Sequence, residues 1–465
     1  MPEQTGGVRD IAPLLACESL RGWMAKQRWY AAKSRGISAI ELVESTPLCD
    51  DLYLALVQAR LATGAHEVYQ LLLITQDPGS ERDRAQDPIA RTPELEAFDA
   101  LSEPRHVLEL LRLMLSDDEL RTDQGCFAFR HVEGAYHPAE DANVRSMGAE
   151  QSNSSFIIDD RVALKLVRRV ESGISPELEL LRFLTARGFK HIAPLQGWYE
   201  YEGSSLASTL GIAQEFVPDG RDGWELALEE IISDPQGLLE RIHRLGMVTG
   251  QMHTALASDA GDPAFSPQDP STEALALLTA SIDEEIERMF LRLPDTEVVA
   301  PIYGCGEDVR AKLAMRAQIS AGGKQIRIHG DYHLGQTLAT PRGWVILDFE
   351  GEPARSLPER RQKRSPLKDV AGMLRSFAYV TSAVELQRGQ QAPEGFEEQM
   401  REQFLNGYLA EVDLALMPGG RPAIMNILSI FELEKAVYEL QYELNNRPDW
   451  VAIPVSGIRR LLEAA

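Results

Sequence analysis

Residues 325–352 read QIRIHGDYHLGQTLATPRGWVILDFEGE and contain two short polar groups, each preceded by apolar residues. Two isoleucines come before the group that contains Asp331, and the apolar run 345–347 comes before Asp348. Apolar runs that end in turn residues are typical of buried strands. We therefore expect Asp331 and Asp348 to lie at the ends of two strands in one hairpin-like unit.

The polar side chains of this stretch have the chemistry that phosphoryl transfer needs. Gln336 follows Asp331 by five residues, and Asp348 follows Gln336 by twelve. An amide oxygen and a carboxylate are hard ligands of the kind that hold Mg²⁺ between a protein and phosphates. The reaction also needs a carboxylate that orients the acceptor hydroxyl and a cation on the phosphates that stay behind. The HGD tripeptide alone would be interpreted as an ordinary turn, but the full spacing favours phosphoryl transfer.

The blocks HGDYHLGQ and DFEGEP resemble the catalytic and metal loops of the aminoglycoside phosphotransferase branch of the protein-kinase-like fold. Within that branch they are most similar to the actinobacterial maltokinase-like family, and the resemblance extends over nearly the whole chain. It implies that Asp331 is the catalytic base and that Gln336 and Asp348, with Glu350 beside them, hold Mg²⁺. Gln336 stands where most relatives carry Asn, and the longer side chain keeps the carbonyl oxygen.

The resemblance and the pattern along the chain predict an α+β, protein-kinase-like bilobal fold in three parts. Residues 1–90 are expected to form an additional N-terminal α/β cap subdomain. Residues 91–215 are expected to form an intermediate subdomain that is like a kinase N-lobe and binds nucleotide. Residues 216–465 are expected to form a mostly helical C-terminal lobe with the catalytic loop and the sugar site. A chain of 465 residues is too long for one compact core of usual size.

Charge and cysteine content limit the partners and the compartment. The net charge of −24 argues against nucleic acid or an anionic membrane, because both are bound by basic surfaces. The four cysteines have no metal-like or paired spacing, and acidic residues interrupt the segment before Cys17, so we expect no signal peptide. We predict a reduced, cytoplasmic protein that binds small molecules, with other carbohydrate-metabolising enzymes as candidate partners.

Residues 149–170 predict a strand, a polar turn and a second strand. In kinase-like folds a loop of this kind covers the nucleotide phosphates and is usually rich in glycine. Here Ser152, Asn153 and Ser154 stand in that region, and they offer hydroxyl and backbone N–H groups to phosphate oxygens. We therefore expect these three residues to contact ATP.

Lys165, at the end of the second strand, is the expected lysine for the nucleotide phosphates. The segment 176–185 predicts an amphipathic helix that starts with Pro176 after Ser175 as N-cap. The resemblance implies that Glu179 of this helix pairs with Lys165, while Glu177 is the competing choice. The alternative is that Lys165 is only a charged residue on an exposed strand edge.

Residues 214–218, QEFVP, end an apolar run between Lys165 and the catalytic block. On sequence alone they are a strand end before a turn. Their position implies the hinge that contacts adenine through Gln214, Glu215 and Val217.

The segment 431–454 predicts a helix on which polar and aromatic side chains share one face. Lys435, Glu439, Tyr442 and Asn446 are spaced by four, three and four residues. Such a face suits a sugar, whose hydroxyls bind polar groups and whose ring packs on aromatics. The ending NNRPDW matches the substrate-side signature of the family, so we favour a sugar site over an ordinary exposed helix. The expected sugar contacts are Lys435, Tyr438, Glu439, Tyr442, Glu443, Asn446, Arg447, Asp449 and Trp450.

Two further residues are expected to support the catalytic loop without binding ligand. His253 lies in a predicted helix, where a single histidine is more often a buttress than a ligand. Asp369 lies at the start of a predicted apolar-faced helix, LKDVAGMLRSFAYV, where it can brace the loop.

The leading functional hypothesis is an ATP- and Mg²⁺-dependent sugar kinase that transfers the γ-phosphoryl group to a sugar hydroxyl. Acidic residues near both site segments favour D-glucosamine, whose ammonium they would attract, giving glucosamine 6-phosphate: Glu350 and Glu352 beside the metal loop, and Glu439, Glu443 and Asp449 in the C-terminal segment. The alternative is a maltokinase that makes maltose 1-phosphate. A second alternative is a catalytically inactive kinase-like scaffold.

Overall fold

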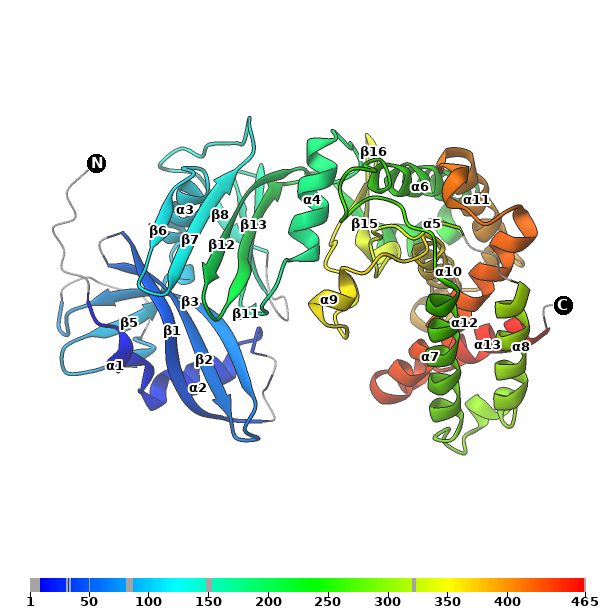
Figure 1. The fold of residues 1–465 in the computed structure, drawn as a ribbon, viewed down its shortest axis with the longest axis horizontal. Coiled ribbons are helices and arrows are strands. Elements are labelled where there is room, and N and C mark those ends of the chain that lie inside the picture. The colour runs from blue at the N-terminus through cyan, green and yellow to red at the C-terminus, as the bar shows by residue number, and fades with distance from the viewer. Residues whose placement is uncertain are drawn as a thin grey trace. The chain divides into compact units, whose positions relative to one another are not determined.

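A computed structural model describes residues 9–30, 32, 35–49, 51–80, 87–147, 153–319 and 323–463. The chain divides into two compact units. The strand-rich unit comprises Met1–Arg182 and Ala193–Pro218, and the helical unit comprises Phe183–Ile192 and Asp219–Ala465. Figure 1 shows strands throughout the blue-to-green part of the chain and helices through most of its green-to-red part. None of the helices in these described ranges is long and apolar enough to cross a membrane.

The first sheet of the strand-rich unit has the strand order β1-β2-β3-β5-β4, with β11 paired to β3. Its central strands are apolar on both faces: Leu54 and Leu72 belong to one core, and Tyr53 and Tyr69 belong to another. The period-2 alternation of side chains along these strands therefore separates two cores. The elements are α1 (Ala12–Leu15), α2 (Glu18–Lys26), β1 (Ile37–Cys49), β2 (Leu52–Leu61), β3 (His66–Gln76), β4 (Ala90–Arg91), β5 (Glu96–Asp99), η1 (Ala100–Ser102) and β11 (Arg169–Val170).

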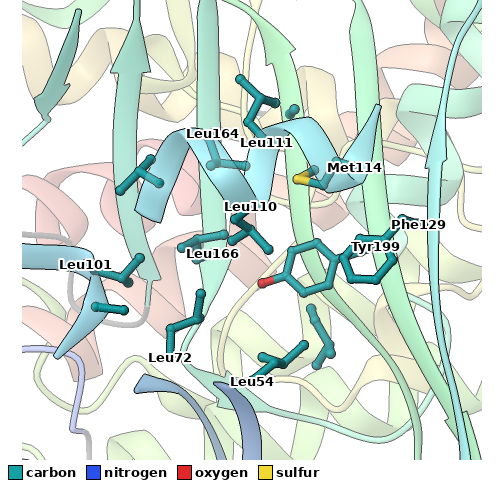
Figure 2. Packing of buried hydrophobic residues seen from close by; sticks show 14 of the residues in the cluster. Leu54, Leu72, Leu101, Leu110, Leu111, Met114, Phe129, Leu164, Leu166 and Tyr199 are labelled. Atoms are coloured by element: carbon teal, nitrogen blue, oxygen red, sulfur yellow. The ribbon is translucent and has the colours of Figure 1, made fainter. Parts of the chain in front are cut away.

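The second sheet of this unit has the order β6-β7-β12-β13-β10-β9-β8. Figure 2 shows how its residues Leu164 and Tyr199 meet Leu54 of the first sheet and Leu111 of α3 in one core, so the two sheets are packed as a single body. The elements are α3 (Pro104–Met114), β6 (Glu119–Arg121), β7 (Gly125–His131), β8 (Val144–Ser146), β9 (Asn153–Ile158), β10 (Val162–Val167), α4 (Pro176–Ala186), β12 (Leu195–Gly203) and β13 (Ala207–Glu215).

The predicted strand–turn–strand at 149–170 is confirmed as the antiparallel pair β9 and β10. Asp159 and Asp160 in its turn have φ angles of 51° and 50°. Two consecutive left-handed residues make the tight hairpin turn that matches strand twist, and aspartate tolerates that conformation better than most residues. The sequence thus determines this hairpin locally.

The helical unit contains one small sheet, β14-β15-β16, and a set of packed helices. Residues of α7, α8, α12 and α13 share one of its apolar cores. The elements are β14 (Arg221–Asp222), α5 (Gly223–Ser233), α6 (Pro235–Leu256), α7 (Thr272–Phe290), η2 (Glu297–Ile302), α8 (Gly306–Ile319), η3 (Leu334–Gln336), β15 (Thr337–Thr340), β16 (Gly343–Ile346), α9 (Leu357–Arg360), α10 (Leu367–Arg388), α11 (Phe396–Glu411), η4 (Leu414–Leu416), α12 (Arg421–Asn446), η5 (Pro448–Trp450) and α13 (Ala452–Glu463).

The expectation of a regular strand before Asp331 is wrong. Ile326 and Ile328 are buried, but this segment makes only isolated bridges, at Gln325 with Gln268 and at Ile326 with Arg364. An apolar run reports burial, and a strand also needs a neighbour that stays alongside it. The predicted hairpin lies further on, between β15 and β16, where Thr337 is paired with Ile346.

Candidate active site

The backbone of the catalytic loop is held by a carboxylate at the start of α10. Asp369 Oδ2 accepts a hydrogen bond of 2.8 Å from the backbone N–H of His329, and Oδ1 accepts one of 2.9 Å from Gly330. His253 of α6 lies behind it, with Nε2 3.1 Å from Asp369 Oδ2, and His253 Nδ1 is 3.0 Å from the Tyr408 hydroxyl. The supporting roles expected for His253 and Asp369 are confirmed.

Asp369 remains an acceptor although it is almost completely buried. Burial by itself would raise the pKa of its carboxyl, but the hydrogen bond from His253 and the charge of that ring hold the pKa below its usual value. Gly330 has a φ of 90°, a conformation that favours glycine. Asp369 therefore fixes the backbone of the catalytic loop in the absence of substrate.

Asp331 follows this anchored backbone and meets a cation from another part of the sequence. Lys435 Nζ of α12 lies 3.2 Å from Asp331 Oδ1, and the two side chains are 29% and 23% exposed. Burial by itself would raise the pKa of the Asp331 carboxyl, but Lys435, followed by His333, holds it below its usual value. Burial also disfavours the Lys435 ammonium, yet Asp331 and two further carboxylates raise its pKa to about 12. At neutral pH the pair is ionised.

The β15–β16 hairpin brings two of the expected metal ligands together. Gln336 immediately precedes β15, Asp348 follows β16 by two residues, and Gln336 Nε2 donates to Asp348 Oδ2 at 3.0 Å. Asp348 has a φ of 57°, in the left-handed region that non-glycine residues seldom adopt. Glu350 lies half-buried in the turn that follows. Antiparallel pairing explains why residues twelve apart in sequence are in contact.

This donor set fits Mg²⁺ shared with phosphates. In the parts of the chain that the structure describes, no three or more His, Cys, Asp or Glu side chains are grouped to enclose a metal ion. Mg²⁺ in phosphoryl-transfer sites takes one or two protein carboxylates and completes its shell with water and phosphate oxygens. Asp348 can supply the carboxylate, and the carbonyl oxygen of Gln336 the neutral ligand.

On the strand-rich unit, Lys165 of β10 pairs with Glu177 of α4. Lys165 Nζ lies 3.0 Å from Glu177 Oε2, and these side chains are 18% and 5% exposed. Glu177, the competing choice of the sequence analysis, is thus a partner of Lys165, and the pairing of Glu179 with Lys165 stays a prediction. Both glutamates lie in the first turn of α4, so helical spacing alone does not decide between them.

The other residues expected to bind ATP are placed as follows. Ser152 lies outside the described residues. Asn153 begins β9, and the Ser154 hydroxyl accepts a hydrogen bond of 2.9 Å from Arg168 Nε. Gln214 Nε2 donates to the Ala193 carbonyl at 3.1 Å, the Glu215 N–H donates to the Pro194 carbonyl at 2.8 Å, and Val217 is half-buried just beyond β13. The strand end expected at 214–218 is thus present.

The predicted helix of the sugar site is confirmed as the second half of α12, but its carboxylates are not all directed alike. Glu439 Oε2 accepts from Arg375 Nε at 3.0 Å and from a terminal nitrogen at 2.7 Å. Glu443 accepts from Arg447 at 2.7 and 2.9 Å and from the Tyr379 hydroxyl at 3.0 Å. Both glutamates are buried by these contacts. The Glu439 carboxylate thus links α12 to Arg375 of α10, and the Glu443 carboxylate links α12 to Tyr379 of α10 and to Arg447 at the helix end.

The aromatic members of the expected sugar site are accessible. Tyr438 and Tyr442 are exposed, and the Lys435 ammonium lies 5.3 Å from the centre of the Tyr438 ring. The Arg447 guanidinium lies over the rings of Tyr442 and Trp450. Asn446 Nδ2 donates to the Tyr442 carbonyl at 2.8 Å, and Asp449 is exposed in η5.

A pocket in the helical unit is lined both by Asp331 and by residues of α12. Asp331, Lys435 and Tyr438 line it together with charged residues that the sequence analysis did not place in the site: Glu285, Arg355, Lys368 and Glu434, and also Glu352, which it noted only as an acidic neighbour. Lys368 Nζ lies 2.7 Å from Glu434 Oε1, and Arg355 Nε lies 2.7 Å from Glu352 Oε2. Burial, and after it Glu434, raise the pKa of Glu285. The lining of this pocket thus combines Asp331 with further carboxylates and with cationic side chains.

The family is shown by comparison with known proteins. The model of the phosphotransferase enzyme family matches residues 143–403, which is more than half of the chain. The chain belongs to this phosphotransferase family. A second model, the maltokinase N-terminal cap domain, matches residues 23–101. The predicted family and enzyme class are confirmed.

Several relatives of this phosphotransferase are glucosamine kinases. That of Mycolicibacterium smegmatis is 26% identical over 336 residues, which cover 69% of this chain and 79% of the relative. That of Streptacidiphilus jiangxiensis is 24% identical over 341 residues, 68% of this chain and 73% of the relative. A solved glucosamine kinase in complex with glucosamine, ADP and inorganic phosphate has a TM-score of 0.73 at 17% identity, over 98% of this chain and 99% of that one. This likeness shows the fold, and the predicted kinase-like fold with a cap is confirmed.

The residues that the sequence analysis missed in this phosphotransferase come from distant segments. Glu285 belongs to α7, and Lys368 and Glu434 belong to α10 and α12. Arg355 lies in the basic, proline-rich stretch that follows DFEGEP, and its charge was the one available signal. For Glu285 there was none, since a glutamate in an amphipathic helix is ordinarily solvated.

Proposed function

We propose that this phosphotransferase is an ATP-dependent sugar kinase that transfers the γ-phosphoryl group of ATP to a sugar hydroxyl. The observation that carries the proposal is Asp331, anchored through its loop by Asp369, ionised beside Lys435, and exposed to a pocket of charged and aromatic side chains. A sugar is a small polyol, and such lining suits its hydroxyls and ring. An inactive scaffold would not need to keep an ionised carboxylate accessible.

In the proposed reaction Asp331 accepts the proton of the acceptor hydroxyl as that oxygen forms its bond to the γ-phosphorus. The bond between the γ-phosphorus and the β–γ bridging oxygen breaks, and its electron pair leaves with ADP. Asp331 later releases the proton to solvent. Lys165 would neutralise the phosphates that are not transferred, and Mg²⁺, held by Gln336 and Asp348 with Glu350 nearby, would supply positive charge to the polyphosphate.

D-glucosamine, phosphorylated to glucosamine 6-phosphate, is the first candidate acceptor. Relatives over most of the chain are named glucosamine kinases. In addition, Glu285 and Glu352 line the pocket beside the base. An ammonium at C2 would pair with one of these carboxylates, and a neutral sugar would gain nothing from the pairing.

Maltose, phosphorylated to maltose 1-phosphate, is the second candidate acceptor. The match to the maltokinase cap domain favours it. Glu439 and Glu443, which the sequence analysis counted toward ammonium binding, are held by Arg375 and Arg447. The pocket acids are likewise partly neutralised by Arg355 and Lys368.

The deciding experiment measures kcat/KM with ATP and Mg²⁺ for glucosamine, N-acetylglucosamine, glucose and maltose in one ADP-coupled assay. An ammonium-selective site prefers glucosamine over both glucose and the N-acetyl sugar. A clear preference for maltose assigns the second candidate. If none of the four sugars stimulates ADP release, the sugar-kinase proposal is overturned in favour of the scaffold.

We further propose that the chain works as three parts, 1–90 as a cap, 91–215 for nucleotide and 216–465 for catalysis and sugar. We also propose that it acts in the cytoplasm. Its four cysteines, Cys17, Cys49, Cys126 and Cys305, are not joined by disulfides in the structure, which suits a reducing compartment.

A further inference from the structure

Lys435 is a half-buried lysine with an unusual position. It lies in the middle of α12 and reaches a carboxylate 104 residues away in sequence, with Nζ 3.2 Å from Asp331 Oδ1. Asp331 Oδ2 accepts no hydrogen bond from the residues that the structure describes. One oxygen of the base is thus held by a cation, and Asp331 as a residue lines the pocket.

The contact is poorly suited to a purely structural role. With 29% and 23% of the two side chains exposed, the pair is of the kind that contributes little to stability. The attachment of α12 to α10 is already provided by the buried pair of Arg375 and Glu439, whose side chains are 1% and 10% exposed. Lys435 is therefore not needed to dock the helix that carries it.

We propose that Lys435 is a positioning residue for the base: it holds Asp331 Oδ1 and thereby directs Oδ2 toward the acceptor hydroxyl. This inference rests on the proposed function, because it takes Asp331 as the base of phosphoryl transfer. The DYHLGQ segment itself contains no lysine or arginine. The cation that contacts Asp331 therefore comes from α12, as Lys435, and not from the catalytic loop itself.

The charged groups around the pair support this geometry. Asp331 is faced by Lys435, His333 and His329, while Lys435 is faced by Asp331, Glu439 and Glu352. The histidine charges act more weakly on Asp331 than Lys435 does, and burial acts in the opposite direction. When Lys435 is removed, burial therefore dominates and the pKa of Asp331 rises.

The test compares Lys435→Met, Lys435→Arg and Lys368→Met as full-length proteins. Lys368 is the matched control, because it is a second lysine of the same pocket but pairs with Glu434. In Lys435→Met we expect kcat near neutral pH to fall about 10²-fold, as misplaced catalytic groups do, with smaller changes in the KM values for ATP and sugar. Arginine, which is always charged, should restore part of that loss.

The pH profile separates positioning from folding. In the wild type the acid limb of kcat/KM, which reports the free base, lies below the usual 3.8 of an aspartate, since the pKa of Asp331 is lowered. In Lys435→Met the limb moves to higher pH, whereas in Lys368→Met it stays where it was. Thermal unfolding midpoints of the two Lys435 variants should stay close to the wild type, whereas that of Lys368→Met should fall, because this change removes a partner of the buried Glu434 carboxylate.

Three outcomes would overturn the inference: an unmoved acid limb in Lys435→Met, an equal shift in Lys368→Met, or a loss of activity that follows a loss of folded protein. A separate arm does not depend on sugar turnover. Carbon-13 carboxyl spectra, with Asp331 assigned by Asp331→Asn, should show Asp331 titrating at higher pH in Lys435→Met. If the wild type phosphorylates no sugar but this titration moves, the proposed function fails while the contact between Lys435 and the carboxylate stands.

Discussion

Lys435 and Glu439 lie four residues apart on α12, and each forms an ion pair with a distant residue, but the two pairs differ in burial. Lys435 pairs with Asp331 through a single contact of 3.2 Å, and both side chains remain about a quarter exposed. Glu439 pairs with Arg375 through two hydrogen bonds, and both side chains are buried. The two hydrogen bonds of the closed pair both go to Oε2 of a buried glutamate, whereas the open pair keeps its carboxylate about a quarter exposed. Neighbouring positions on one helix face are therefore divided between catalysis and folding by what packs against them.

The largest change in activity is expected at the open pair, and its absence would contradict the comparison. Asp331→Asn should lower kcat about 10²- to 10⁴-fold, the range for loss of a general base. ATP affinity and the unfolding midpoint should change little, because Lys165 and the metal ligands are untouched. Steady-state kinetics and titration calorimetry measure the two properties. Asp308→Asn, an exposed carboxylate on α8, is the control, and near wild-type kcat in Asp331→Asn would remove the base from its role.

The closed pair should respond in stability. Arg375→Met leaves the Glu439 carboxylate buried without its partner, and we expect a loss of about 3–5 kcal/mol in the free energy of unfolding of the helical unit. Chemical denaturation followed by circular dichroism measures it. If Glu439→Gln instead raises KM for the sugar and leaves stability unchanged, Glu439 belongs to the sugar site as the sequence suggested, and the division between the two turns is lost.

A third pair, in the strand-rich unit, sharpens the comparison. Lys165 Nζ lies 3.0 Å from the Glu177 carboxylate, and the side chains of Lys165 and Glu177 are 18% and 5% exposed. In this pair the lysine is therefore the more accessible residue. We expect Lys165→Met to raise KM for ATP roughly 10- to 100-fold, the value of a charge-assisted hydrogen bond of about 1.5–3 kcal/mol. KM for the sugar should change little. Equal changes in both KM values would point to unfolding of the unit and not to loss of a phosphate contact.

The smallest effect should come from a pair with no burial on either side. Arg288 and Glu284 lie four residues apart on α7, with 51% and 70% of their side chains exposed. Arg288→Met should change the free energy of unfolding by no more than about 0.5 kcal/mol, with kinetics unchanged. A larger loss would show that exposure is a poor guide to the worth of these ion pairs.

The sequence by itself determined the parts of the site that are local. Apolar residues around a two-residue aspartate turn gave the β9–β10 hairpin with Lys165. The sequence placed Gln336 and Asp348 in one hairpin-like unit, and in the structure they flank the β15–β16 hairpin, where their side chains are 3.0 Å apart. In both cases the partners are close along the chain, and antiparallel pairing fixes their register.

Tertiary structure alone decided the contacts between distant segments. Helical periodicity put Lys435 and Glu439 on one face, but it could not say that one would meet Asp331 and the other Arg375. It likewise left Glu177 and Glu179 equivalent as partners of Lys165, and it gave no reason to bring Glu285 to the pocket. Periodicity determines which side chains share a face, whereas the packing of α10 and α12 determines which of those side chains are buried and which keep an atom free for a substrate.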